Sequence, residues 1–325
     1  MSIAGLTFGA YPLGIAGTPT GLATGPQDDF EKIQSAFKEL QGNSAKVLAR
    51  NYILYMGPGS EERMLGAIEQ HRQHGILADL TLGCYQEPGV PLDGWREFIR
   101  QVVRQFGKDL DLLQITNEPN LSFMEGSKPF VVEALVGGVL AAKEEIKTLG
   151  LTLPVGFGSV PSGPAALPNF WKDLANFGGQ KFAEAVDFVG HNFYVDVFEE
   201  PLPLEKVPSE AERILRDLRE NLLPVAGIPA TVPIHITENG WPTGKNAYFG
   251  VERTYEQQAS VLETVVRTVY RLRTELNITH YEFFELRDAD SHNDDIFHQF
   301  GLLRDDYSPK PAFYVYQNLI RELGA

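Results

Sequence analysis

The sequence has few cysteines, a deficit of basic charge and no long apolar run. Cys84 is the only cysteine in 325 residues, so the chain cannot form an internal disulfide. Lys and Arg number 28 against 43 Asp and Glu, and the net charge of −15 is opposite to the basic surface that nucleic acids and anionic membranes attract. No apolar segment is long enough to span a bilayer. We therefore expect neither nucleic acid nor a membrane as a partner.

The start of the chain also lacks the features of a secretory leader. Residues 1–4, Met-Ser-Ile-Ala, contain no basic residue, and no apolar leader core follows them. As written, the sequence is that of a cytoplasmic protein, and it would be a secreted one if a leader had been removed. A hydrophobic content of 43% and a charged content of 22% are ordinary for a water-soluble globule. They do not indicate an oligomeric state.

Short apolar runs alternate with segments of helical periodicity along the whole chain. We expect strands at residues 3–8, 47–49, 76–82, 110–115, 153–157, 186–190, 233–238 and 278–286. We expect helices at residues 30–40, 60–75, 95–106, 130–149, 168–177, 209–223, 252–276 and 311–323, and a long loop at residues 14–26 that is rich in Gly and Pro.

Eight strand–helix units without a break in composition predict one domain, residues 1–325, folded as a closed (β/α)8 barrel of the α/β class. An open doubly wound sheet is the structural alternative. It requires the G-x-G-x-x-G spacing in its first turn, which Gly5, Gly9 and Gly14 do not match. In a barrel the carboxyl ends of all strands open on one face, so polar residues that end different strands are expected to converge.

Two of these strand ends carry a glutamate in a similar context. The run at residues 110–115 is followed by Thr116-Asn117-Glu118-Pro119, and the run at residues 233–236 by Thr237-Glu238-Asn239-Gly240. Cleavage of a glycosidic bond needs two carboxyl groups, one to protonate the leaving oxygen and one opposite it. Either glutamate alone is most simply a solvated loop residue, but the repeated context favours a catalytic pair.

These residues resemble the retaining glycoside hydrolases of clan A, and the likeness covers the chain as a pattern of eight units from Leu6 to Leu323. The resemblance implies that Glu118 is the acid/base, that Asn117 binds the sugar 2-hydroxyl and that Glu238 is the nucleophile. It also favours the retaining mechanism, in which the two carboxyl groups lie about 5 to 5.5 Å apart, over the inverting one with about 6.5 to 9.5 Å.

The resemblance assigns three further site residues. Arg50, at the end of the second strand, matches an arginine that orients the nucleophile; its alternative is a surface ion pair. His191 and Tyr194 match residues that line the site, although a lone His is usually a satisfied structural residue. Trp241 is a site candidate outside the resemblance, because an aromatic ring on the loop three residues after the nucleophile can stack on a sugar. Its alternative is a packing role at the barrel rim.

The sequence departs from the clan at the end of the eighth strand. Residues 281–288, Tyr-Glu-Phe-Phe-Glu-Leu-Arg-Asp, lack the Trp that often forms a sugar platform there. The segments at residues 286–290 and 300–311 resemble bacterial members that act on β-glucans and exopolysaccharides. The expected partner is therefore a β-linked oligo- or polysaccharide.

Two other functions stay open. A non-catalytic carbohydrate-binding barrel would not need both glutamates. A Schiff-base aldolase needs a Lys that points into the barrel, but the sixth strand and the loop after it contain no Lys between Lys181 and Lys206. A phosphate-ester enzyme needs a phosphate-binding site at the loops after strands seven and eight, but here the loop after strand eight is acidic. We expect no cofactor and no metal, because no His/Cys/carboxylate cluster has ligand spacing. The aspartates after residue 287 do not follow the calcium-loop pattern.

Overall fold

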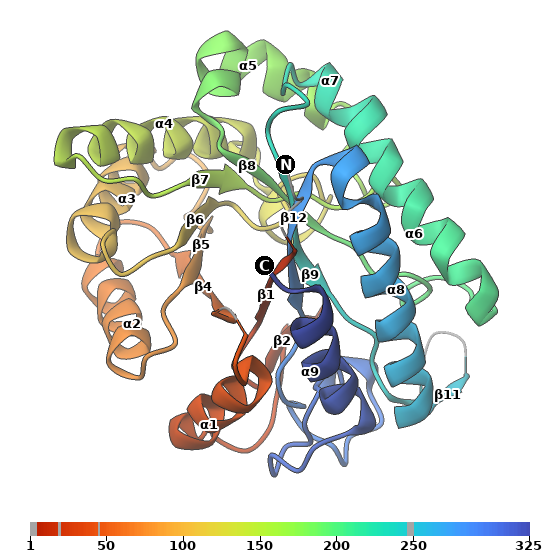
Figure 1. The fold of residues 1–325 in the computed structure, drawn as a ribbon. Coiled ribbons are helices and arrows are strands. Elements are labelled where there is room, and N and C mark those ends of the chain that lie inside the picture. Colours follow the sequence, from red (N-terminus) through yellow and green to blue (C-terminus); the bar gives the residue numbers. More distant parts are fainter. Residues whose placement is uncertain (1–4, 19–20, 45, 246–249) are drawn as a thin grey trace. The chain divides into compact units, whose positions relative to one another are not determined.

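The computed structural model describes residues 5–18, 21–44, 46–245 and 250–325 (Figure 1). The expectations for residues 3 and 4 therefore lie outside the described residues. Within this part of the chain, eight parallel strands close into a barrel in the order β1-β12-β9-β8-β7-β6-β5-β4. These strands are β1 (Thr7–Ala10), β4 (Leu48–Tyr55), β5 (Asp79–Cys84), β6 (Leu112–Ile115), β7 (Val155–Phe157), β8 (Phe188–Asn192), β9 (Ile234–Asn239) and β12 (Ile278–Phe283).

Helices follow the strands as the sequence pattern predicts. They are α1 (Phe30–Gln41), α2 (Glu61–Gln73), α3 (Asp93–Phe106), α4 (Val131–Leu149), α5 (Phe170–Ala185), α6 (Val207–Arg216), α7 (Leu223–Val225), α8 (Tyr255–Leu276) and α9 (Pro311–Leu323). Single turns of 3-10 helix occur at η1 (Met124–Ser127), η2 (Leu204–Lys206) and η4 (Ile296–His298). None of the helices in the described ranges is both long and apolar enough to cross a membrane.

The described chain divides into two compact units. Unit 1 comprises Met1–Ala49, Phe193–Leu215 and Ile236–Ala325, and unit 2 comprises Arg50–Asn192 and Arg216–His235. In unit 1, α8 and α9 lie side by side (Figure 1, blue). The Tyr316 hydroxyl of α9 donates to the carbonyl of Gly9 in β1 at 2.6 Å. The last helix is thereby fixed to the first strand.

Unit 2 is built around buried faces of α3 and α4, which also lie side by side (Figure 1). The apolar residues of α3 recur at helical spacing and are buried, as the periodicity predicts. The Trp95 indole N–H donates to the carbonyl of Ala134 in α4 at 2.9 Å. Gly138 of α4 faces β6, and a Cβ there would lie 2.7 Å from Cγ2 of Ile115. The absence of a side chain at Gly138 lets α4 approach the strand that precedes Glu118.

Several sequence expectations are wrong in detail. The strand predicted at residues 47–49 continues to Tyr55, and the helix predicted at residues 168–177 continues to Ala185. The predicted loop at residues 14–26 contains an antiparallel hairpin, β2 (Ile15–Thr18) with β3 (Gly21–Thr24), whose four-residue strands leave no hydrophobic period to detect.

The helix predicted from residue 252 begins only at Tyr255, because β11 (Glu252–Arg253) pairs with β10 (Gly244–Lys245). The helix predicted at residues 209–223 is interrupted by a π-helical segment, η3 (Asp217–Leu222), since its apolar period alone does not register such a change.

Candidate active site

Glu118 is held in unit 2 by a side chain from the end of β8. Its strand, β6, is fully buried and ends at Ile115, after which the chain turns with Thr116 at a φ of 66°. The Asn192 amide Nδ2 donates to Glu118 Oε1 at 3.0 Å and to Asn117 Oδ1 at 3.2 Å. One amide group therefore orients both residues that follow β6. Asn192 lies between His191 and Tyr194, the two residues for which the family resemblance implies a role in the site. The sequence alone did not indicate a role for Asn192 itself.

A buried carboxylate accepts hydrogen bonds from the backbone of the same turn. Glu125, in η1, is 2% exposed, and its two oxygens accept from the backbone N–H of Cys84 at 2.8 Å and of Asn117 at 2.9 Å. It thus joins the end of β5 to the residue before Glu118. Burial raises the pKa of Glu125 to about 7, although both hydrogen bonds favour the charged form. No sequence pattern indicates this role, because Glu125 lies in the short turn η1 and belongs to no motif.

His191 lies in β8 and is fully buried. The Ser159 hydroxyl donates to the carbonyl of Gly190 at 2.8 Å and lies 2.9 Å from His191 Nδ1. Because that hydroxyl has one proton, Nδ1–H is the donor to Ser159, and Nε2 carries the lone pair. Burial lowers the pKa of His191 to about 3, so the ring is neutral at ordinary pH. Its role in substrate contact stays a prediction.

Arg50 is fully buried in β4, which excludes the surface ion pair that the sequence left open. Its Nη1 lies 2.6 Å from Asp79 Oδ2, and its Nε donates to the Tyr52 hydroxyl at 2.7 Å. Burying a charge pair is costly because both ions lose their hydration, so a pair like this one is weak evidence for a stabilising role. The expectation that Arg50 orients the nucleophile stays a prediction.

Glu238 is held in unit 1 by Tyr194. It is 7% exposed in β9, and the Tyr194 hydroxyl donates to Glu238 Oε2 at 2.7 Å. The next residue, Asn239, is fixed on both sides of its amide: Nδ2 donates to the carbonyl of Phe193 at 2.7 Å, and Oδ1 accepts from the Tyr281 hydroxyl at 2.5 Å. The backbone N–H of Phe193 donates to the carbonyl of Glu238 at 3.1 Å. The carboxylate therefore stands on a rigid strand end.

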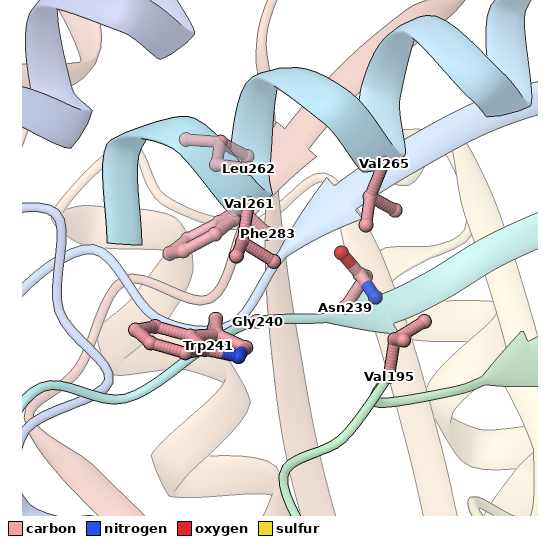
Figure 2. A pocket seen from close by; sticks show the side chains of 8 residues that line it. All are labelled: Val195, Asn239, Gly240, Trp241, Val261, Leu262, Val265 and Phe283. Carbon is pink, nitrogen blue, oxygen red and sulfur yellow. The ribbon is translucent and has the colours of Figure 1, made fainter. Parts of the chain in front are cut away.

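Trp241 is packed in unit 1, as its structural alternative describes. It is 6% exposed, its indole N–H donates to Asp196 Oδ1 at 2.5 Å, and the Arg253 guanidinium carbon lies 4.5 Å from the ring centroid. Figure 2 shows Trp241 beneath α8, where it lines a pocket together with Val261 and Phe283. Whether it also contacts a sugar stays a prediction.

Each unit thus brings one glutamate together with its own hydrogen-bond donor. Unit 2 gathers Glu118, Asn117 and Asn192, and it holds His191 and Arg50 on other partners. Unit 1 gathers Glu238 and Tyr194, and it holds Trp241 against Asp196. Among the residues that the structure describes, no group of three or more His, Cys, Asp or Glu is arranged to hold a metal ion. The reactive groups at these two strand ends are therefore the carboxyl groups of Glu118 and Glu238, which can transfer protons or act as nucleophiles.

No protein-family model and no curated protein matches the sequence. Solved structures of glycoside hydrolases do share its fold. A β-glucosidase from Thermotoga maritima has a TM-score of 0.62 at 16% identity and covers 99% of both chains. A family 39 glycoside hydrolase from Bacteroides cellulosilyticus has a TM-score of 0.59 at 17% identity, with 97% of this chain matched to 63% of that one. This chain therefore spans less than two thirds of the latter protein.

A third similar structure is an active-site mutant of a β-1,3-glucanosyltransferase from Rhizomucor miehei, in complex with laminaritriose. Its TM-score is 0.57 at 15% identity, and 94% of this chain covers 96% of that one. At such identities the likeness concerns the fold. At that level the resemblance to the clan-A glycoside hydrolases is confirmed.

Proposed function

We propose that the protein is a retaining glycoside hydrolase that cleaves β-linked oligo- or polysaccharides, with Glu238 as the nucleophile and Glu118 as the acid/base. Glu238 attacks the sugar carbon and forms a covalent glycosyl intermediate, while Glu118 protonates the departing oxygen. Glu118 then takes a proton from water, which attacks the same carbon and releases Glu238. No metal or cofactor takes part in these steps.

One observation carries the proposal: the donors to the two glutamates lie two residues apart in the chain. Asn192 donates to Glu118 and Tyr194 donates to Glu238. Phe193, between them, bonds through its backbone to Glu238 and to the Asn239 amide. A single short segment is therefore bonded to both carboxyl groups, as expected if they act on one substrate.

The two donors suit different roles. The Tyr194 hydroxyl fixes one carboxyl oxygen of Glu238 at 2.7 Å, which suits a group that must attack the sugar carbon from one direction. The Asn192 amide fixes the rotamer of Glu118 and, through the same nitrogen, the amide of Asn117, which the proposal assigns to the sugar 2-hydroxyl. A preorganised pair of this kind loses little entropy on binding.

The substrate class is inferred from the similar structures. Two of them are named as a β-glucosidase and a β-1,3-glucanosyltransferase, the latter in complex with laminaritriose. Both names refer to β-linked glucose. This supports a β-glucan or a related saccharide as the substrate and agrees with the likeness of residues 286–290 and 300–311 to β-glucan-active members.

The aldolase alternative finds no support at the buried lysine Lys310. Its Nζ lies 2.6 Å from Asp288 Oδ1, and it also donates to Thr243 Oγ1 at 3.1 Å and to the carbonyl of Gln299 at 3.4 Å. Burial lowers the pKa of Lys310, and the Asp288 carboxylate beside it opposes that shift. A Schiff base requires an amine that is free to attack a carbonyl group, whereas these three acceptors hold the fully buried Lys310 nitrogen inside the protein.

The proposal is tested with an aryl β-glucoside, on which a good leaving group needs no acid. Glu118→Ala should still form the intermediate and then stall, and azide should release it as a β-glycosyl azide. On a β-glucan oligosaccharide, the same variant should lose about 10²- to 10⁴-fold in kcat. Glu238→Ala should be inactive on both substrates, and azide should there give the α-anomer.

Glu39→Ala is the matched control, because Glu39 is an exposed glutamate of α1. It should leave both activities unchanged. Products longer than the substrate oligosaccharide would indicate glycosyl transfer in place of hydrolysis. Full activity of Glu238→Ala on the aryl glucoside would refute the assignment of the nucleophile.

A further inference from the structure

A cluster of aromatic rings in unit 1 extends from the residue that holds Glu238 to the protein surface. Tyr194 makes edge contacts with Phe198 at 5.6 Å and with Phe300 at 5.7 Å, measured between ring centroids. Phe198 stacks on Phe297 at 5.9 Å with the ring planes 25° apart, and Phe297 also contacts Phe300 at 6.5 Å. The four rings come from two segments, one after β8 and one at η4.

Exposure rises steadily across this cluster. Phe300 is 2% exposed, Tyr194 and Phe297 are half-buried, and Phe198 is 47% exposed. A single exposed apolar ring is common, but Phe198 belongs to a contiguous aromatic group, and contiguous apolar surface is what marks a ligand-binding site. The rings below Phe198 fix its position, so a ligand would find the face already ordered.

The cluster is joined directly to the proposed nucleophile. The Tyr194 ring contacts Phe198, and its hydroxyl donates to Glu238 Oε2 at 2.7 Å. A molecule on the Phe198 face is therefore separated from Glu238 by a single tyrosine side chain. Asp295, the N-cap of η4, accepts from the N–H of Phe297 through its side chain at 3.0 Å, and the buried Gln299 after η4 donates through Nε2 to the carbonyl of Asn293 at 2.7 Å. These bonds hold the segment that carries Phe297 and Phe300.

We propose that Phe198 and Phe297 form an aromatic platform that binds a sugar ring of a β-linked oligosaccharide, next to the ring that reacts at Glu238. The platform rests on the proposed function and adds to it a preference for chains over short glycosides. An aromatic face suits the apolar face of a β-linked pyranose, whose hydroxyls point outward from the ring.

Phe198→Ala tests the platform by comparing two substrates. A β-glucosyl fluoride fills the reacting position only, because its leaving group is a single atom, whereas a β-1,3-linked glucose tetramer reaches beyond that position. The variant should raise KM for the tetramer by about tenfold, the size expected for one aromatic contact, and leave KM and kcat for the glucosyl fluoride within about twofold. Phe198→Tyr keeps the ring and should keep the wild-type KM.

Phe177→Ala is the matched control, because Phe177 is an exposed phenylalanine of α5 in the other unit, with 56% exposure. It should change neither substrate. Equal loss on both substrates in Phe198→Ala would overturn the platform, since Phe198 would then act through Tyr194 on Glu238. An unchanged KM for the tetramer would also overturn it.

Calorimetry separates failure of the platform from failure of the proposed function. Glu238→Gln cannot form the intermediate, yet it should bind the tetramer, and adding Phe198→Ala should weaken that binding about tenfold. This result would hold even if the wild type hydrolysed nothing. Absence of tetramer binding in both proteins would refute the platform. The platform would also be refuted if Phe198→Ala abolished self-association of the protein but left tetramer binding unchanged, because Phe198 would then bind a second copy of the chain.

Discussion

At the scale of single residues, Glu125 determines how the Asn117–Glu118 turn is held, and it also makes the fold sensitive to pH. Its pKa rises from 4.5 when unfolded to about 7 when folded, because burial disfavours the charge. Between these values the folded chain binds one more proton than the unfolded chain. Stability is therefore full below pH 4.5 and falls as the pH rises towards 7.

We predict that Glu125→Gln removes this pH dependence. From pH 4.5 to 7, the wild type should lose about 3 kcal/mol of unfolding free energy relative to the variant, at about 1.4 kcal/mol per pH unit. Urea titrations of both proteins across this range measure it. Glu39→Gln, at an exposed site, should run parallel to the wild type; parallel curves for Glu125→Gln would contradict the account.

Trp241 is a residue for which packing and sugar stacking predict different outcomes. Its burial and its bond to Asp196 predict that Trp241→Ala lowers the free energy of unfolding by about 3 to 5 kcal/mol. Trp241→Phe keeps most of the apolar volume and should cost less. A Trp241→Ala protein of unchanged stability that binds oligosaccharide more weakly would instead show that stacking is the role of this ring.

At the scale of elements, two helical glycines that look alike in sequence have opposite effects. Gly66 of α2 is exposed, with nothing within 4 Å of a Cβ, so Gly66→Ala should stabilise the protein by about 0.5 to 1 kcal/mol. Gly138 of α4 packs against Ile115 and Ile99, so Gly138→Ala should destabilise it despite the better helix propensity. Denaturant midpoints for the two variants measure both signs, and a stabilised Gly138→Ala would contradict the packing.

The segment between β12 and α9 is held by the buried pair of Lys310 and Asp288, both fully shielded from water. Lys310→Met should cost about 3 to 5 kcal/mol, because it leaves a buried carboxylate without its cation. The surface pair of Arg267 and Glu322 is about half exposed, and Arg267→Ala should cost less than about 1 kcal/mol. The unfolding temperature should fall clearly more for Lys310→Met than for Arg267→Ala. Similar decreases in the two variants would contradict the difference in burial between the two ion pairs.

The elements themselves could largely be read from the sequence, because most barrel strands are apolar runs that end near Gly, Pro or a polar cluster; β4, which contains Arg50 and Asn51, is an exception, and its length was underestimated. The helix expected at residues 30–40 is α1, and Asp29 caps it by accepting from the N–H groups of Glu31 and Lys32. The bonds of Asn192 and Glu125 could not be read in this way. They join residues 74 and eight positions apart, and only the closed strand order and a loop conformation decide that they meet.

At the scale of the whole molecule, the alternation of eight strands and their helices specified a closed barrel, and the closed strand order confirms it. The same order explains why residues that end distant strands can serve one reaction, since a parallel barrel presents its strand ends on one face. The central claim is that Glu238 attacks the sugar and Glu118 protonates and deprotonates, which gives two inversions and net retention.

Proton NMR of the first sugar that the intact enzyme releases from an aryl β-glucoside tests this claim most directly. The spectrum must be recorded before mutarotation mixes the anomers. The account predicts that the β-anomer appears first and the α-anomer grows in later. If the α-anomer appears first, water attacks the sugar directly in a single inversion, and Glu238 is not the nucleophile.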